Sequence, residues 1–330
     1  MKKKIALVTG GYSGESVISY KSAESMFNNI DQEKWECYII DVHPDGWFYK
    51  AENGEHIDVD KNDFSITVAG EKINFDAVFV GLHGTPGEDG KLQGYLDCLS
   101  IPYTTSGAAT SALTFNKRYT VAVAAFAGMH VARSVHLFQN DKSTASTITN
   151  QLNLPVFIKP NNGGSSLGIS KVNEVEELET ALEKAFKEDS EVLAEEFVSG
   201  REFTIGVFRS KGKIITLPIT EIKSQNEFFD FQAKYEGASD EITPAEVSDE
   251  IAQQVRNEAI KAYTVFNCGG VVRIDFIYEE TKGQPYMLEI NTVPGQSSAS
   301  IVPQQVVAMG WSLKDFYTSL IEECMNKQSQ

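Results

Sequence analysis

Short apolar runs alternate with longer segments in which apolar positions recur every three or four residues. The runs at residues 5–8, 37–42 and 76–82 are each followed by a polar residue, which is typical of buried strands. Between the first two runs, residues 15–29 have helical spacing. Strands that alternate with helices predict a parallel α/β sheet in the N-terminal third of the chain, with ligands at the carboxyl ends of its strands.

The middle of the chain predicts a second, smaller group of strands with one helix. Residues 134–139, 154–160 and 191–200 have the apolar composition of strands. The glycine- and serine-rich segment 161–172 follows the second of them and predicts a flexible loop. An amphipathic helix is expected before the third strand, with a buried stripe formed by Val175, Leu178, Leu182 and Phe186.

The C-terminal part predicts a β-hairpin, two helices and an irregular segment. The hairpin consists of strands at 271–278 and 285–291. Residues 222–240 are rich in aromatic residues but have no clean period, so we expect a lid or binding loop. Helices are expected at 250–267 and near the C-terminus, where two residues have the spacing of a capping box, Ser312 and Asp315.

The hairpin carries the candidate chemistry of the chain. Glu289 and Asn291 are two residues apart and share one face of their strand, as do Arg273 and Asp275 on the other strand. Carboxylate and amide oxygens on adjacent strands suit Mg²⁺, and a guanidinium beside them would stabilise the charge that develops in phosphoryl transfer. The alternative is a solvent-facing hairpin, but it does not explain charged residues inside apolar runs, where unpaired charge is costly.

A second candidate site lies at the end of the strand 154–160. Lys159 closes that strand, and the loop 161–172 follows at once. An ammonium group, backbone N–H groups and hydroxyls in this order can surround phosphate oxygens, although a plain hairpin turn is the alternative. The loop after residues 76–82 is also polar, and its residues taken alone are as compatible with a structural role as with a functional one: His83, Glu88 and Asp89.

Composition and charge narrow the functional classes. The net charge of −17 argues against nonspecific binding to nucleic acid or anionic membranes, and a phosphate site must therefore gather its cations locally. No stretch approaches the ~20 apolar residues of a membrane helix. The four cysteines form no CxxC pair. We expect a cytoplasmic protein with free thiols and without membrane insertion.

Eight motifs occur in an order that resembles one known family. Over essentially its full length, the chain is similar to the D-alanine–D-alanine ligases of the ATP-grasp superfamily. The motifs are GGYSGES (10–16), LHGTPGEDGKLQG (82–94), FNKRYT (115–120), FIKPNNGGSSLGISKV (157–172), VLAEEFVSGREFT (192–204), FFDFQAKY (228–235), RIDF (273–276) and LEINTVPGQSSASIVP (288–303).

The resemblance implies an α/β fold of three domains with the ATP-grasp architecture. An N-terminal Rossmann-like substrate domain would span 1–105, and a small lid domain would span 106–195. A C-terminal domain, 196–330, would carry the metal site and the lid loop 222–240, and ATP would lie between two antiparallel sheets. In the implied reaction, ATP phosphorylates the carboxylate of one D-alanine, and the amine of a second D-alanine then displaces phosphate. The dipeptide would serve peptidoglycan synthesis.

The resemblance also implies the residues that bind ATP and metal. Two Mg²⁺ or Mn²⁺ ions would bind to Asp275, Glu289 and Asn291. The phosphates would contact three lysines, Lys117, Lys159 and Lys234. The adenine and ribose would contact Glu195, Phe197, Val198 and Glu202.

Further roles implied by the resemblance concern the two amino acids. The first D-alanine would be held by Glu15 and His83, and the second by Ser300 and Ile301. Arg273 and the backbone N–H of Gly295 would stabilise the tetrahedral oxyanion. A hydrogen-bonded trio would close the lid over the site: Ser165, Tyr235 and Glu15.

Two other interpretations stay open at this point. The chain could be another ATP-grasp ligase that joins a different acid and amine, including a D-alanine–D-lactate or D-alanine–D-serine ligase. It could also bind ATP without catalysis, although Arg273, Asp275 and Lys159 are all present. The expected partners are two D-alanine molecules and ATP, with no nucleic acid, and the expected assembly is a homodimer.

Overall fold

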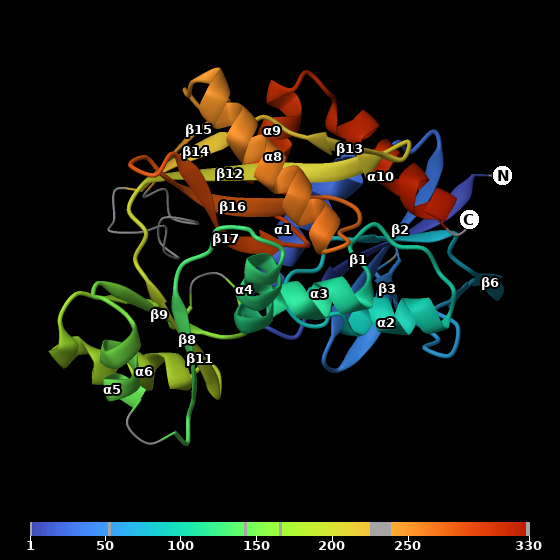
Figure 1. Ribbon diagram of the computed structural model, residues 1–330. Coiled ribbons are helices and arrows are strands. Elements are labelled where there is room, and N and C mark those ends of the chain that lie inside the picture. The colour runs from blue at the N-terminus through green and yellow to red at the C-terminus, as the bar shows by residue number, and fades with distance from the viewer. Residues whose placement is uncertain (1, 52–53, 142–143, 165–166, 225–238, 328–330) are drawn as a thin grey trace.

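The computed structural model describes residues 2–51, 54–141, 144–164, 167–224 and 239–327 (Figure 1). They form a mixed α/β fold with several sheets, which confirms the expected fold class. Within these ranges, no helix has both the length and the apolar composition that a membrane crossing requires. The expected lid loop is only partly visible, because 225–238 lie outside the described residues and the ends of that segment are strands.

The N-terminal sheet has the order β4-β3-β2-β1-β7. Its centre is parallel as expected, because β1 pairs in parallel with β2 and β7. Its edge is not, since the chain reverses at the turn before Gly46 and β3 and β4 add antiparallel. The strands are β1 (Lys3–Gly10), β2 (Trp35–His43), β3 (Gly46–Lys50), β4 (His56–Asp58) and β7 (Ala77–Val80), with a separate hairpin of β5 (Ile66–Val68) and β6 (Glu71–Ile73).

Four helices of this half are placed around the carboxyl ends of the parallel strands or lead to the next sheet. The first begins directly after the glycine turn at the end of β1, with Glu15 at its N-cap position. Their bounds are α1 (Ser16–Asn29), α2 (Lys91–Cys98), α3 (Ala108–Phe115) and α4 (Lys117–Phe126) among the described residues.

The smaller sheet is antiparallel and has the order β10-β9-β11-β8. One face packs against α5 and α6, which lie on the side away from β16 and β17 (Figure 1). Val175 was wrongly assigned to the buried stripe, since it lies in a 3-10 turn before α6 and is 50% exposed. The elements are β8 (Ser134–Phe138), α5 (Thr144–Gln151), β9 (Val156–Pro160), β10 (Ser170–Val172), α6 (Leu178–Phe186) and β11 (Glu191–Glu196).

The larger sheet follows the order β15-β14-β12-β16-β17, and β13 pairs with β12. Phe203, Ile205 and Phe276 face one side, where α8 covers them. Alternate residues face the other side, and these include Asp275. The elements are β12 (Arg201–Ser210), β13 (Lys213–Thr216), β14 (Thr220–Ser224), β15 (Ser239–Ile242), α8 (Asp249–Val265), β16 (Val272–Glu279), β17 (Gln284–Asn291), α9 (Ile301–Ala308) and α10 (Leu313–Lys327).

A β-bulge in β17 brings the predicted ligands to one face. Asp275 pairs with Glu289, whereas the next residue of β16, Phe276, pairs with Met287, so Leu288 is the extra residue. Met287 is buried in the core beneath α8, and a regular strand would have placed Glu289 on that same side. The bulge therefore reverses the alternation and turns Glu289 toward the opposite, polar face.

The N-terminal sheet and the larger sheet share one hydrophobic core. Ile5 and Phe79 of the N-terminal sheet pack in the same cluster as Phe208 of β12 and Val302 of α9. Residues of α10 belong to this cluster as well. Ser312 and Asp315 contact each other at the start of α10, where they were predicted: Ser312 Oγ accepts from the backbone N–H of Asp315 at 3.1 Å and donates to Asp315 Oδ2 at 2.6 Å. The smaller sheet has a cluster of its own.

Candidate active site

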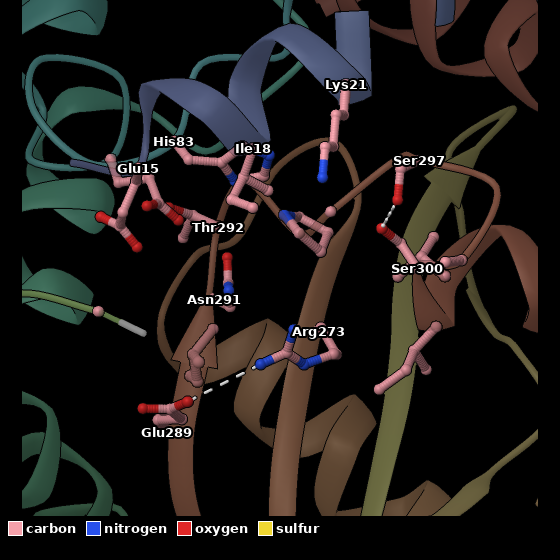
Figure 2. Close-up of a pocket in the computed structure, with 18 of the residues that line it drawn as sticks. Glu15, Ile18, Lys21, His83, Arg273, Glu289, Asn291, Thr292, Ser297 and Ser300 are labelled. Atoms are coloured by element: carbon pink, nitrogen blue, oxygen red, sulfur yellow. Dashed lines mark hydrogen bonds and ion pairs between the residues drawn. The ribbon is translucent and has the colours of Figure 1, made fainter. Parts of the chain in front are cut away.

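A cavity of about 690 Å³ lies between α1, the loop after β7, the hairpin β16–β17 and the segment that leads to α9. Figure 2 shows Glu15 and His83 at one end, Ser297 and Ser300 at the other, and Arg273 between them. Many of the predicted site residues line it: Glu15, His83, Lys117, Arg273, Glu289, Asn291, Gly295, Ser300 and Ile301. Asp275 is not among the lining residues, because its side chain is buried behind Arg273, to which it is hydrogen-bonded.

Arg273 is fixed at the centre by two acidic side chains. Its Nε and Nη2 donate to the two carboxylate oxygens of Asp275 at 2.9 and 2.8 Å. Its Nη2 also lies 3.8 Å from Glu289 Oε1. Asp275 accepts a further hydrogen bond from Thr204 Oγ1 on β12. This bidentate pair holds the guanidinium in one orientation, facing the cavity.

The three predicted metal ligands are brought together by strand register. Asp275 lies opposite Glu289, and Arg273 lies opposite Asn291, so all four side chains belong to one face of the hairpin. Asn291 Oδ1 accepts from the backbone N–H of Val293 at 3.2 Å, which orients its amide. Two carboxylates and an amide oxygen form a hard-oxygen donor set that suits Mg²⁺ when phosphate oxygens complete the coordination.

The end of the cavity beneath α1 contains a buried polar cluster. Ser22 Oγ lies 3.0 Å from His83 Nε2, and burial lowers the pKa of His83 to about 4. Glu88 accepts from the backbone N–H of Gly84 at 2.6 Å, and burial, reinforced by the neighbouring charge of Glu15, raises its pKa to about 8. Near neutral pH, His83 and Glu88 are therefore both uncharged. Glu15 remains as the carboxylate of this end that can pair with an ammonium group.

The other end of the cavity is formed by the start of α9. Ser300 occupies the N-cap position, and its hydroxyl lies 2.8 Å from that of Ser297. A Cβ atom on Gly295 would lie 2.6 Å from Ser300 Oγ, so a larger residue at this position would displace the Ser300 side chain. A hydroxyl beside the open N–H groups of a helix start is well suited to a carboxylate.

Comparison with known proteins identifies the family. A family model described as the D-ala D-ala ligase N-terminus matches residues 4–106, and one described as the D-ala D-ala ligase C-terminus matches 115–322. The chain belongs to the D-alanine–D-alanine ligase family. A D-alanine–D-alanine ligase of Parabacteroides distasonis is 45% identical over 98% of each chain.

Solved structures agree with this membership in the D-alanine–D-alanine ligase family. The VanG D-Ala:D-Ser ligase from Enterococcus faecalis has a TM-score of 0.88 at 31% identity, over 98% of this chain and 99% of its own. The D-alanine–D-alanine ligase from Bacillus anthracis complexed with ATP has a TM-score of 0.78 at 27% identity, over 98% of both chains. The expected family and fold class thus have independent support.

Two of the predicted nucleotide residues of this ligase-family chain, Lys159 and Glu195, lie on strands of the smaller sheet, on the face opposite its core. Phe157 and Lys159 alternate with core residues on β9, and Glu195 on β11 pairs opposite Phe157. Lys159 and Glu195 form an ion pair with each other. Phe197 follows β11, and its ring lies 4.8 Å from the ammonium of Lys171. These residues, with Val198 and with Glu202 on β12, do not line the 690 Å³ cavity but lie beyond it.

The glycine loop after Lys159 connects this nucleotide face to the cavity. Lys117 Nζ donates to the carbonyl of Gly163 at 2.8 Å. A Cβ atom on Gly164 would lie 2.7 Å from Glu15 Oε1, so the loop passes directly beside the Glu15 carboxylate. Three predicted residues, Ser165, Lys234 and Tyr235, lie outside the described residues. Their roles stay predictions.

Several polar residues that were not predicted from the sequence also line the cavity of this ligase-family member. Lys21 extends from α1 into the cavity, on the same helical face as Ile18 (Figure 2). The spacing of Ile18, Lys21, Ser25 and Asn28 is a helical signal that was available in the sequence. Glu241 on β15 also lines the cavity, and it had no such signal because its strand is short and it directly follows the aperiodic segment 222–240.

Proposed function

We propose that this chain joins two D-alanine molecules in an ATP-dependent reaction that yields D-alanyl-D-alanine, ADP and phosphate for peptidoglycan synthesis. The observation that carries the proposal is the position of Arg273 between the two ends of one cavity, each end suited to one zwitterion. Family membership and the ATP complex of a relative at 27% identity support it.

The first amino acid fits the end with Glu15. Its ammonium pairs with the Glu15 carboxylate, and its carboxylate points toward Arg273 and the hairpin. There the carboxylate oxygen attacks the terminal phosphorus of ATP, and the bond from that phosphorus to ADP breaks. Lys117 and Lys159 neutralise charge on the phosphates. We propose that Asp275, Glu289 and Asn291 hold Mg²⁺, which would shield the phosphate oxygens.

The second amino acid fits the end with Ser300. Its carboxylate accepts from the Ser300 hydroxyl and the Ile301 N–H, and Lys21 supplies a cation on the opposite wall. Its amine attacks the carbonyl carbon of the acyl phosphate, and the carbon–oxygen bond to phosphate breaks. Arg273 and the N–H of Gly295 stabilise the oxyanion of the tetrahedral intermediate. Water must be kept from the acyl phosphate throughout, since it hydrolyses.

Release of ADP and phosphate in the presence of candidate substrates tests this proposal. We expect turnover with D-alanine alone and identification of the dipeptide by mass spectrometry, with far lower turnover for L-alanine. D-serine and D-lactate are the informative second substrates, because a structural relative is a D-Ala:D-Ser ligase. Turnover with another acid–amine pair and none with D-alanine would contradict the proposal.

Two further properties belong to the same proposal. We propose that the chain works in the cytoplasm, where ATP and the amino acids are available, and that it forms a homodimer as its family resemblance implies. Light scattering of the purified chain would measure the assembly. A monomer at working concentration would refute the dimer without affecting the reaction.

A further inference from the structure

The cavity contains one half-buried carboxylate that the proposed reaction leaves without a role. Five acidic residues line it: Glu15, Glu24, Glu88, Glu241 and Glu289. In the proposed reaction Glu15 binds the first D-alanine and Glu289 binds metal, whereas Glu88 is buried and its raised pKa keeps it protonated near neutral pH. Glu24 lies exposed on α1. Glu241 remains, and it sits on β15, at the far edge of the larger sheet.

Strand register places Glu241 on the same face as the catalytic residues. Glu241 pairs with Ile222 on β14, and Ile222 pairs with Glu202 on β12. Glu202 is two residues from Thr204, which pairs with Asp275. Paired residues share a face and residues two apart on one strand share a face, so Glu241 and Asp275 point to the same side.

One hydrogen bond fixes Glu241 beside the end of the cavity that takes the second amino acid. Gln304 Nε2 donates to Glu241 Oε2 at 2.9 Å. Gln304 lies in the first turn of α9, one helical turn after Ser300, so the carboxylate is held next to the helix start. Burial raises the pKa of Glu241, while the Gln304 amide and the positive charge of Arg273 oppose that rise.

The chemistry of the second substrate requires a group of this kind. A D-alanine zwitterion binds with its amino group protonated, and an ammonium nitrogen has no lone pair with which to attack a carbonyl carbon. The proton must therefore leave before the carbon–nitrogen bond forms. We propose that Glu241 is the carboxylate that receives the ammonium of the second amino acid and accepts its proton. This inference rests on the proposed ligase function.

The proton balance of the step is complete without another reactant. The ammonium gives one proton to the Glu241 carboxylate, and the neutral amine attacks the acyl phosphate. The new carbon–nitrogen bond leaves a second proton on nitrogen, which departs with the phosphate as the carbon–oxygen bond breaks. Glu241 then releases its proton to water when the products leave.

The charged neighbours of Glu241 are compatible with this role. Arg273 on β16 is the cation that acts on it through the cavity. Lys21 and Glu24 face it from α1 across the same cavity, and α9 contributes the uncharged Gln304. On the adjacent strand β14, the charged residues Glu221 and Lys223 pair with Ile242 and Asp240 and so lie on the other face of the sheet.

The variant Glu241→Gln tests the inference because the amide keeps an oxygen for Gln304 and loses only the charge and the basicity. We expect kcat/KM for the second D-alanine to fall about 10²-fold near pH 7, the scale of a lost general base. The difference in kcat/KM between the variant and the wild type should shrink near pH 10, where the substrate amine deprotonates unaided. Glu24→Gln, the other carboxylate of this cavity without a role, is the matched control and should be unchanged.

Hydroxylamine separates a proton-transfer role from a structural one. It is a neutral nucleophile near pH 7, so it can trap the acyl phosphate of the first D-alanine as a hydroxamate without needing a base. We expect Glu241→Gln to form hydroxamate at the wild-type rate. The inference would be overturned if Glu241→Gln had the kinetics of the wild type with D-alanine, or if its kcat/KM were reduced by the same factor at every pH. It would also be overturned if hydroxamate formation fell by the same factor as dipeptide formation. Absence of dipeptide from the wild-type protein would instead refute the proposed function.

Discussion

At the scale of single residues, Arg273 is the side chain on which the charge balance of the site depends. It neutralises Asp275, which is 8% exposed and accepts from Thr204 as well. Removing the guanidinium would leave a buried carboxylate without its partner, which is strongly destabilising. A loss of activity in Arg273→Ala would therefore combine folding and catalysis, and the neighbouring acids are better probes of chemistry.

Glu289→Gln should separate turnover from stability. The Glu289 side chain is 40% exposed and lies 3.8 Å from Arg273, so the free energy of unfolding should change by no more than about 0.5 kcal/mol. Turnover should fall at least about 10²-fold, because a metal-binding charge beside the phosphates is lost. Steady-state kinetics and thermal melting measure the two effects. Unchanged turnover with unchanged melting would exclude the metal role.

Glu88→Gln should change how stability depends on pH. The folded pKa of about 8 exceeds the ordinary value of 4.5, so the folded chain holds a proton that the unfolded chain releases. The resulting stabilisation is present below about pH 4.5 and is lost as pH rises through 8. A glutamine cannot ionise, so the Tm of the variant relative to the wild type should rise across this window. Exposed Glu24→Gln serves as the control, and a difference that stays constant with pH would refute the shift.

At the scale of elements, the contribution of a helix cap to stability can be measured at the start of α10. Ser312 caps the helix, and α10 packs into the core that the N-terminal and larger sheets share. Ser312→Ala should lower the free energy of unfolding by about 1 kcal/mol. Ser319→Ala in the same helix, whose hydroxyl only returns to the Phe316 carbonyl, is the matched control and should change little. Denaturant unfolding measures both, and equal effects would contradict the cap.

Individual strands also show which features of the site could be predicted from the sequence and which could not. The common face of Glu289 and Asn291 could be predicted from their period-two spacing, but their pairing with Asp275 and Arg273 could not, because the regular register from the turn would place Leu288 opposite Asp275. The bulge at Leu288 could not, since no glycine marks it and only packing of Met287 against the core beneath α8 reveals it. The contact of Lys159 with Glu195 depends on the register of β9 with β11, which apolar runs do not specify. Glu241 was missed because its strand is short and follows an aperiodic segment.

At the scale of the whole molecule, nucleotide binding should link the two polar sheet faces. A non-hydrolysable ATP analogue at about 100 times its Kd, with Mg²⁺, should stabilise the folded chain by about 2.7 kcal/mol, since binding to the native state alone shifts the equilibrium. Calorimetric melting measures the shift, and a chelator should reduce it. Lys159→Ala on the smaller sheet and Glu289→Gln on the larger should each diminish the shift. If neither does, the nucleotide is not held between these faces.

The common core of the N-terminal and larger sheets has a consequence for how the reaction is organised. Ser22 of α1 accepts from the backbone N–H of Gln296, and Ile5 and Phe79 pack with Val302 of α9. The spacing between the two amino-acid positions is therefore established during folding, before either substrate arrives. We expect any movement that accompanies nucleotide binding to occur in residues 134–196, because their hydrophobic core is separate from the shared one. Neither of the two joined halves can be expected to fold when expressed alone.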